Sequence, residues 1–193
     1  MSQSVRVVVA EDEALVRLDL VEMLGELGYE VVGQAGDGER AIELAEQLRP
    51  DVTLLDVKMP KLDGLAAAAR ITEGGWSAVV MLTAFAQREL VERAVEAGAH
   101  GYIVKPFTAA DLSPAIEVAR GRFSESQALA DEVQDLAERL ETRKVIDRAK
   151  ARLQDRLGLS EKESFAWLQR TAMDRRTSMR AVAEVVLAEI PEV

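Results

Sequence analysis

Two patterns of hydrophobic and polar positions divide the chain near residue 120. Before that point, short β-branched runs of strand length alternate with segments in which leucine and alanine recur at helical spacing. The runs cover residues 5–10, 30–35, 51–56, 78–83 and 101–105. Because nearly continuous apolar strands alternate with helices, this part predicts an α/β fold with a doubly wound, five-stranded parallel sheet. The spacing leaves the strand order open.

Polar residues and glycines mark the expected ends of the intervening helices. Aspartate and threonine are favourable N-caps because their side-chain oxygens accept hydrogen bonds from free amide groups, and glycine tolerates the left-handed conformation found after many helices. The expected N-caps are Asp37, Asp63 and Thr108, and the expected helix ends lie at Gly28, Gly74 and Gly98. The chain's one histidine, His100, falls beside such glycines and is expected in a surface loop.

The part after residue 120 is expected to be helical throughout. Leucine and valine recur there at steps of 4, 3 and 4 residues, at Leu129, Val133, Leu136 and Leu140. This spacing is typical of a coiled-coil seam, although it extends over only two heptads. The seam predicts either a dimer contact through 129–140 or a face that packs on the same chain, and the sequence leaves both open.

Three shorter helices are expected after the seam, at about 143–156, 160–173 and 176–189. Ser160 and Glu163 form a capping-box pattern at the start of the second of these helices. Trp167 follows closely and is expected in the core, as large aromatic side chains usually are. Because roughly fifty residues bury little apolar surface, this small all-α domain is expected to lean on the preceding long helix or on a partner.

Charge is distributed unevenly between the two parts. Residues 1–142 hold 13 Lys/Arg against 26 Asp/Glu, whereas residues 143–193 hold 11 against 8. An acidic body with a basic tail suggests two separate tasks. The chain has no cysteine, which excludes disulfides and thiolate metal sites. With neither a secretion signal nor a stretch of membrane-spanning length, the sequence predicts a cytoplasmic protein without membrane contact.

Chemically active side chains stand at the ends of four predicted strands. They are Glu11 with Asp12, Asp56, Thr83 and Lys105. Because the carboxyl ends of neighbouring parallel strands open onto one crevice, we expect these side chains to converge. Three carboxylates beside a hydroxyl and an ammonium group predict a site that handles phosphoryl groups, with Lys105 and Thr83 binding the phosphoryl oxygens.

The carboxylates suggest distinct roles within this crevice. Asp56 is the expected nucleophile, since a carboxylate can attack phosphorus to give an aspartyl phosphate. Glu11 and Asp12 would repel it unless a hard divalent cation lay between them, and Mg²⁺ suits such oxygen ligands. The backbone carbonyl of Lys58 is the expected additional ligand.

Four motifs then resemble the receiver domain of two-component response regulators. They are AEDE at 10–13, LLDVKMPKLDG at 54–64, LTAF at 82–85 and YIVKPF at 102–107. The resemblance implies a flavodoxin-like fold over 3–121, with Asp56 as phosphoacceptor for a sensor histidine kinase. It also implies that Thr83 and Tyr102 are a switch pair, and that Lys105 precedes a cis proline. Such a protein is not an enzyme beyond slow autodephosphorylation.

The C-terminal segment 142–187 resembles an ANTAR domain, the RNA-binding module of transcription antitermination regulators. Matching positions include Ala149, Leu153, Phe165, Leu168 and Ala172. The sequence departs from the family pattern with Ala151 in place of glycine and Ser164 in place of alanine, and close RNA approach near Ala151 is in doubt. The candidate RNA-binding cations are Arg143, Lys150, Arg170, Arg175 and Arg176.

These observations predict a phosphorylation-dependent regulator with a receiver at 3–121, a helical or coiled-coil linker at 122–142 and an ANTAR domain at 143–190. Its expected partners are a histidine kinase, tandem hairpins in nascent RNA, and a second copy of the chain on phosphorylation. Two alternatives stand beside it. The helical output domain could bind DNA or a protein partner instead of RNA. An aspartyl-phosphate hydrolase of the haloacid dehalogenase type would need an acid where this chain has Lys58.

Overall fold

The computed structural model describes residues 4–84 and 88–189, and within them two compact units divided between Ala128 and Leu129. The first unit contains five parallel strands in the order β2-β1-β3-β4-β5. The sequence alone does not predict this order. The strands are β1 (Arg6–Ala10), β2 (Glu30–Ala35), β3 (Val52–Asp56), β4 (Ala78–Thr83) and β5 (Gly101–Val104). The predicted runs therefore agree with the observed strands to within one residue at either end.

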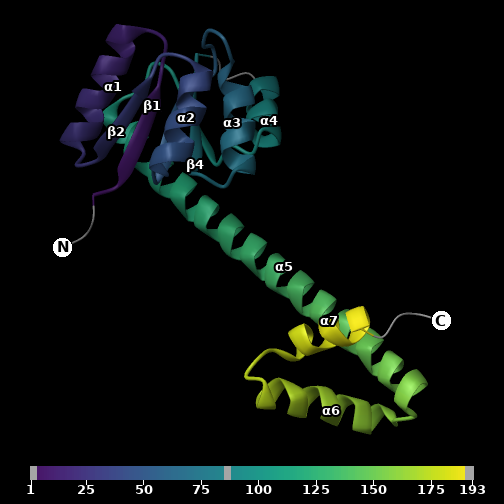
Figure 1. Ribbon diagram of the computed structural model, residues 1–193. Coiled ribbons are helices and arrows are strands. Elements are labelled where there is room, and N and C mark those ends of the chain that lie inside the picture. The colour runs from purple at the N-terminus through teal and green to yellow at the C-terminus, as the bar shows by residue number, and fades with distance from the viewer. Residues whose placement is uncertain (1–3, 85–87, 190–193) are drawn as a thin grey trace. The chain divides into compact units, whose positions relative to one another are not determined.

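Helices cover both faces of this sheet (Figure 1). They are α1 (Ala14–Glu26), α2 (Gly38–Leu48), α3 (Gly64–Glu73), α4 (Arg88–Glu96) and the first turns of α5 (Ala109–Leu157). Alternate strand residues point to opposite faces. Val8 and Leu55 accordingly pack with α2, α3 and α4, whereas Val9 and Leu54 pack with α1 and α5. The predicted doubly wound α/β fold is confirmed.

The predicted helix ends are mostly confirmed. Asp37 and Asp63 cap α2 and α3 by accepting hydrogen bonds from the third amide of each helix. At Thr108 the roles are reversed, because its amide and hydroxyl both donate to the Asp111 carboxylate. Gly28 and Gly98 adopt positive φ after α1 and α4, as expected. Gly74 ends α3 in a right-handed conformation, and the positive φ falls on Gly75 instead.

The helix expected at 143–156 is not a separate element. It is the C-terminal end of α5, which continues from the receiver through the predicted linker to Leu157. Residues 122–142 contain neither proline nor glycine, so nothing in the local sequence interrupts helical hydrogen bonding there. The four seam residues 129, 133, 136 and 140 lie on the surface of α5 and are 54–62% exposed.

The second unit packs the end of α5 against α6 (Glu161–Asp174) and α7 (Met179–Glu189). Its core contains Ala149 and Leu153 from α5 and Leu168 from α6, together with Val182 and Val186 from α7. Both halves of the predicted capping box, between Ser160 and Glu163, are present at the start of α6. In the described part of the chain, no helix has the length and apolar character needed to cross a membrane.

Candidate functional site at the strand ends

The carboxyl ends of β1, β3, β4 and β5 surround a cavity of about 350 Å³. Parallel pairing places these ends side by side, since Asp56 is in register with Leu82 and Thr83 with Val104. Glu11 and Lys105 directly follow β1 and β5. The cavity lining therefore includes all the predicted strand-end residues, namely Glu11, Asp12, Asp56, Thr83 and Lys105, together with Lys58.

Three carboxylates form the acidic part of this cavity. Ligand oxygens of Glu11, Asp12 and Asp56 all lie within 4.8 Å of one another. Asp56 is buried, Asp12 is exposed, and the Glu11 side chain is 1% exposed. Burial raises the pKa of Glu11, because desolvation disfavours its charged form and outweighs its hydrogen bond to Lys105. A nearby positive charge would stabilise the ionised form of Glu11.

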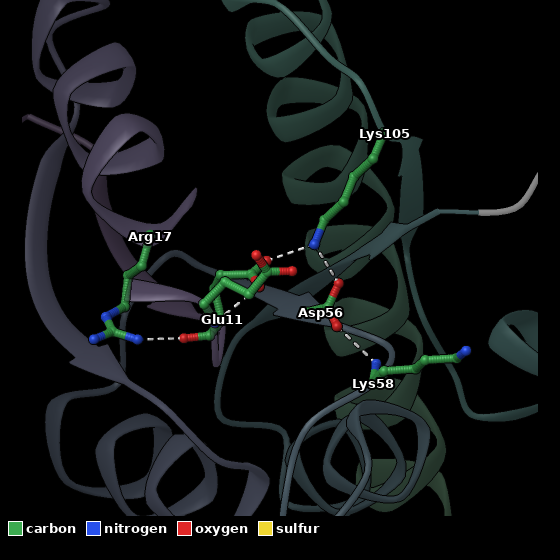
Figure 2. A network of polar contacts seen from close by, with 6 residues as sticks. Glu11, Arg17, Asp56, Lys58 and Lys105 are labelled. Atoms are coloured by element: carbon green, nitrogen blue, oxygen red, sulfur yellow. Dashed lines mark hydrogen bonds and ion pairs between the residues drawn. The ribbon is translucent and has the colours of Figure 1, made fainter. Parts of the chain in front are cut away.

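Lys105 supplies that charge within the protein. Its Nζ lies 2.6 Å from Glu11 Oε2 and 2.6 Å from Asp56 Oδ1, bridging the two acids (Figure 2). Burial alone would lower the pKa of Lys105, but its hydrogen bonds to Asp56 and Glu11 outweigh burial and raise it. The ammonium group is therefore firmly protonated and draws both carboxylates toward one point.

The second oxygen of Asp56 is held by the loop that follows β3. The amide of Lys58 donates to Asp56 Oδ2 at 2.7 Å, so both carboxylate oxygens have defined partners. Gly64, at the start of α3, stands so close that an added Cβ would lie 1.9 Å from the carbonyl oxygen of Asp56. Only glycine fits there. Packing of the loop thus fixes where the Asp56 carboxylate points.

Arg17 is a member of this network that the sequence did not reveal. From α1, one of its guanidinium nitrogens donates to the carbonyl oxygen of Glu11 (Figure 2). The amide of Glu11 donates to the carbonyl of Ala35 on β2. The backbone of Glu11 is therefore fixed on both sides. In the sequence, Arg17 is only an arginine six residues after Glu11. Its contact with Glu11 becomes apparent only when α1 is seen packed beside β1.

The expected switch residues lie on the neighbouring strands β4 and β5 and line different hollows. Thr83 is buried at the end of β4 and lines the acidic cavity. Tyr102 is half exposed and lines a different hollow, formed by β5 and the first part of α5. The bond between Lys105 and Pro106 is cis, as predicted. Phe85, which ends the LTAF motif, lies outside the described residues.

His100 lies in the loop between α4 and β5, as predicted, but it is half-buried, and its Nδ1 accepts a hydrogen bond from the amide of Val79 at 3.2 Å. Trp167 differs from its sequence-based expectation. Trp167 is 40% exposed on α6. The side of α6 that faces the core carries Ser164, Leu168 and Ala172 instead.

The candidate RNA-binding cations are spread over the second unit. Arg143 is well exposed on α5, whereas Lys150 is held by two carboxylates, with Nζ 2.8 Å from Asp147 and 3.1 Å from Glu161. Arg170 lies on α6, and Arg175 and Arg176 lie in the turn that follows, all exposed. The spacing of these five cations in the sequence therefore does not define a single binding site.

Comparison with known families agrees with both units. The family model of the response regulator receiver domain matches residues 7–117, and the ANTAR domain model matches residues 134–187. This chain belongs to the response regulators. It joins a receiver to an ANTAR domain, which is an RNA-binding domain of transcription antitermination. This architecture is not a catalytic enzyme family, and neither matching model is that of a haloacid dehalogenase hydrolase.

One relative is similar to nearly the whole chain, whereas solved structures are similar to part of it. The chain is 59% identical over 182 residues to the transcriptional regulatory protein PdtaR of Mycobacterium tuberculosis, covering 94% of this chain and 89% of that protein. The receiver domain of a sensor histidine kinase from Pseudomonas aeruginosa, solved with magnesium in its active site cleft, matches with a TM-score of 0.56 and 31% identity. That match covers 62% of this chain and 99% of the other.

The chemotaxis complex CheX–CheY–BeF3–Mg of Borrelia burgdorferi supplies a further structural match. Its TM-score is 0.55 at 27% identity, and the match covers 58% of this chain and 86% of the other. Each structural match covers about three fifths of this chain, and both of these structures contain magnesium.

Proposed function

We propose that a sensor histidine kinase transfers a phosphoryl group to Asp56. The observation that carries this proposal is the fixed carboxylate of Asp56, held by Lys105 on one oxygen and by the amide of Lys58 on the other. A carboxylate positioned in this way can attack phosphorus in line with the leaving group. We assign Oδ1, the oxygen bound to Lys105, as the nucleophile, because Lys105 also binds Glu11 and so links this oxygen to the acidic cluster.

We further propose that Glu11, Asp12 and Asp56 hold Mg²⁺, with the backbone carbonyl of Lys58 as an additional ligand. The donor set fits this ion, because Mg²⁺ prefers carboxylate, carbonyl and water oxygens. Bound there, the ion would neutralise charge on the phosphoryl oxygens. The magnesium-bearing receiver of P. aeruginosa supports the assignment by likeness.

The side chains around Asp56 then respond to the new charge. Lys105 exchanges its contact with the Asp56 carboxylate for a contact with a phosphoryl oxygen, and the Thr83 hydroxyl donates to another. As Thr83 moves toward the site, Tyr102 turns inward from its half-exposed position. A change of charge at the strand ends thereby alters the surface of β5 and α5.

The output follows from the second unit. We propose that phosphorylation favours a homodimer through the exposed seam at 129–140, and that two ANTAR domains then bind tandem hairpins in nascent RNA and prevent termination. Linking two RNA-binding domains raises avidity without any new contact. Because a histidine kinase draws its phosphoryl groups from ATP, we place the protein in the cytoplasm.

A comparison of the wild type with Asp56→Asn tests the proposal. After treatment with acetyl phosphate and Mg²⁺, mass spectrometry should find one alkali-labile phosphoryl adduct in the wild type and none in the variant. Gel shifts on tandem hairpin RNA should show tighter binding by the phosphorylated wild type alone. Duplex DNA at matched salt serves as the competitor, and stronger binding to DNA would contradict the RNA assignment. Equal RNA binding by both proteins would contradict the coupling.

A further inference from the structure

A hollow of about 470 Å³ lies where α5 meets α6, within the C-terminal unit. Its lining is formed by Lys150 from α5 and by Ser160, Glu161, Lys162 and Phe165 at the start of α6. Phe165 leaves 45% of its surface exposed, although the unit has a compact aliphatic core built from other side chains. An aromatic ring at the edge of an open hollow presents a flat apolar face to a ligand.

The charges in this hollow largely cancel. The ammonium group of Lys150 lies between the carboxylates of Asp147 and Glu161, at 2.8 and 3.1 Å. Together with Lys162, the hollow and its immediate partners carry two positive and two negative groups. A phosphate would have to compete with both carboxylates for Lys150. A neutral ring with hydrogen-bond donors and acceptors along its edge does not need to displace a carboxylate from Lys150. Its acceptors can bind the ammonium group of Lys150, and its donors can bind the carboxylate of Glu161.

We propose that this hollow is a base pocket, in which Phe165 stacks against one unpaired base of an RNA loop and the Lys150–Glu161 pair contacts the edge of that base. The proposal rests on the proposed RNA-binding function and names the part of the RNA that this unit recognises. Proteins read RNA sequence chiefly through unpaired loop bases stacked on aromatic side chains.

Cations around the hollow suit the adjoining RNA backbone. Lys162 is exposed on its rim. Arg143 precedes Lys150 by seven residues, which places it on the same face of α5 two turns away. Its guanidinium group is well exposed and lies 3.9 Å from Asp147, so it remains accessible to a phosphate. The base pocket and its phosphate contacts thus occupy one side of the α5–α6 pair.

Trp167 provides a matched control on the same helix. It is exposed to a similar extent, at 40%, but follows Phe165 by two residues and so points to a different side of α6. A general requirement for exposed aromatic surface would make both residues important. A base pocket in the hollow makes Phe165 important and leaves Trp167 dispensable.

The test uses the full chain and an RNA hairpin library with a fixed stem and a randomised loop. The library is selected with the wild type and with Phe165→Leu, Phe165→Tyr and Trp167→Leu, each with and without beryllofluoride and Mg²⁺. We expect the wild type, Phe165→Tyr and Trp167→Leu to enrich one loop base at a fixed position. Phe165→Leu should lose that preference and bind the enriched hairpin about tenfold more weakly. Its dependence on salt should be unchanged, because the phosphate contacts remain.

Three other outcomes would overturn the base pocket. Enrichment of the same loops at equal affinity by Phe165→Leu would show that Phe165 stacks on no base. Loss of preference in Trp167→Leu alone would move the base to the other side of α6. If the wild type enriches no hairpin under either condition, the RNA function itself fails, and the pocket fails with it. Circular dichroism of each variant identifies any loss of preference that comes from unfolding.

Discussion

The receiver clusters charged side chains in one cavity, whereas the C-terminal unit carries them on exposed helix faces. In the receiver, Glu11, Asp56 and Lys105 lie together in one cavity and contact one another directly. In the C-terminal unit the core is aliphatic, and Arg143 and Arg170 lie on exposed helix faces. The receiver thus concentrates its chemistry at a point fixed by the sheet, whereas the C-terminal unit distributes it over a surface set by helix packing.

The largest expected effect concerns the small core of the C-terminal unit. Leu153 on α5 is 1% exposed and packs in one core with residues of α6 and α7. Truncation to alanine in Leu153→Ala should lower the free energy of unfolding of this unit by about 3 to 4 kcal/mol, since it removes buried methyl groups and leaves a cavity. Leu157→Ala, at a side chain 57% exposed on the same helix, should change it by less than about 0.5 kcal/mol.

The two tryptophans make this measurement specific, because Trp76 reports on the receiver and Trp167 on the C-terminal unit. Urea unfolding of Trp76→Phe and Trp167→Phe backgrounds should show Leu153→Ala shifting only the Trp167 transition. A parallel shift of the Trp76 transition would mean that the continuous α5 couples the two units into one cooperative whole.

The next effect tests the buried charges of the receiver. Lys105→Met leaves Glu11 and Asp56 without their shared ammonium group and should destabilise the receiver by about 2 to 3 kcal/mol in EDTA. Lys61→Met, which breaks the ion pair of an exposed lysine with Asp37, should change stability far less than Lys105→Met. Urea unfolding followed by Trp76 fluorescence measures both.

Mg²⁺ distinguishes the cause of this loss. If the destabilisation comes from unpaired carboxylates, millimolar Mg²⁺ should restore most of the stability of Lys105→Met and have little influence on the change caused by Lys61→Met. An equal loss in EDTA and in Mg²⁺ would mean that Lys105 acts by packing rather than by charge.

The contrast between the units also explains what the sequence could predict. Parallel pairing brings the carboxyl ends of neighbouring strands together, so the sequence alone predicts that Asp56, Thr83 and Lys105 share one crevice, as they do. Arg17 could not be placed in this way, because its contact with the carbonyl of Glu11 depends on how α1 packs. The cis bond before Pro106 followed from family likeness rather than from spacing.

The helical part carries weaker sequence signals than the receiver. Helical periodicity located α6 and its capping box, but it did not show that the helix expected from residue 143 continues from α5. A helix continues where the sequence lacks a proline, a glycine or another helix-ending residue, and such an absence is harder to recognise than the residue itself. Large aromatic residues are usually buried, but Leu168 and Ala172 occupy the core side of α6, and Trp167 lies exposed.

A smaller effect is expected from Arg17, the network member that spacing missed. Arg17→Lys keeps the positive charge but loses the planar group that donates to the carbonyl of Glu11. Residues that orient metal ligands usually affect metal affinity strongly. Arg17 contacts the backbone of Glu11 rather than its carboxylate, so we expect a smaller loss, of about fivefold, in Mg²⁺ affinity. Isothermal titration calorimetry measures it, with Arg40→Lys on the exposed face of α2 as control. Unchanged affinity would limit Arg17 to a role in helix packing.

The smallest effect concerns the pH dependence of the receiver. Burial, together with the nearby charge of Arg122, lowers the pKa of His100. Because the folded-state pKa lies below the unfolded value, the unfolded chain binds the proton more tightly. The stability contributed by neutral His100 is thus fully present above the unfolded pKa and is lost as pH falls through the folded pKa. Protonation would also turn Nδ1 into a donor facing the amide of Val79.

His100→Asn should remove this dependence while keeping an acceptor near Val79, and the ring contact with Phe123 is lost at every pH. Between about pH 7.5 and about pH 5.5, the wild type should lose up to about 1 kcal/mol relative to the variant, since carboxylates common to both cancel in the difference. Urea midpoints from Trp76 fluorescence measure this difference. Because the chain has one histidine, its ring proton signals in NMR give the folded pKa directly. A difference between the two proteins that stays constant with pH would mean that His100 contributes by packing against Phe123 alone.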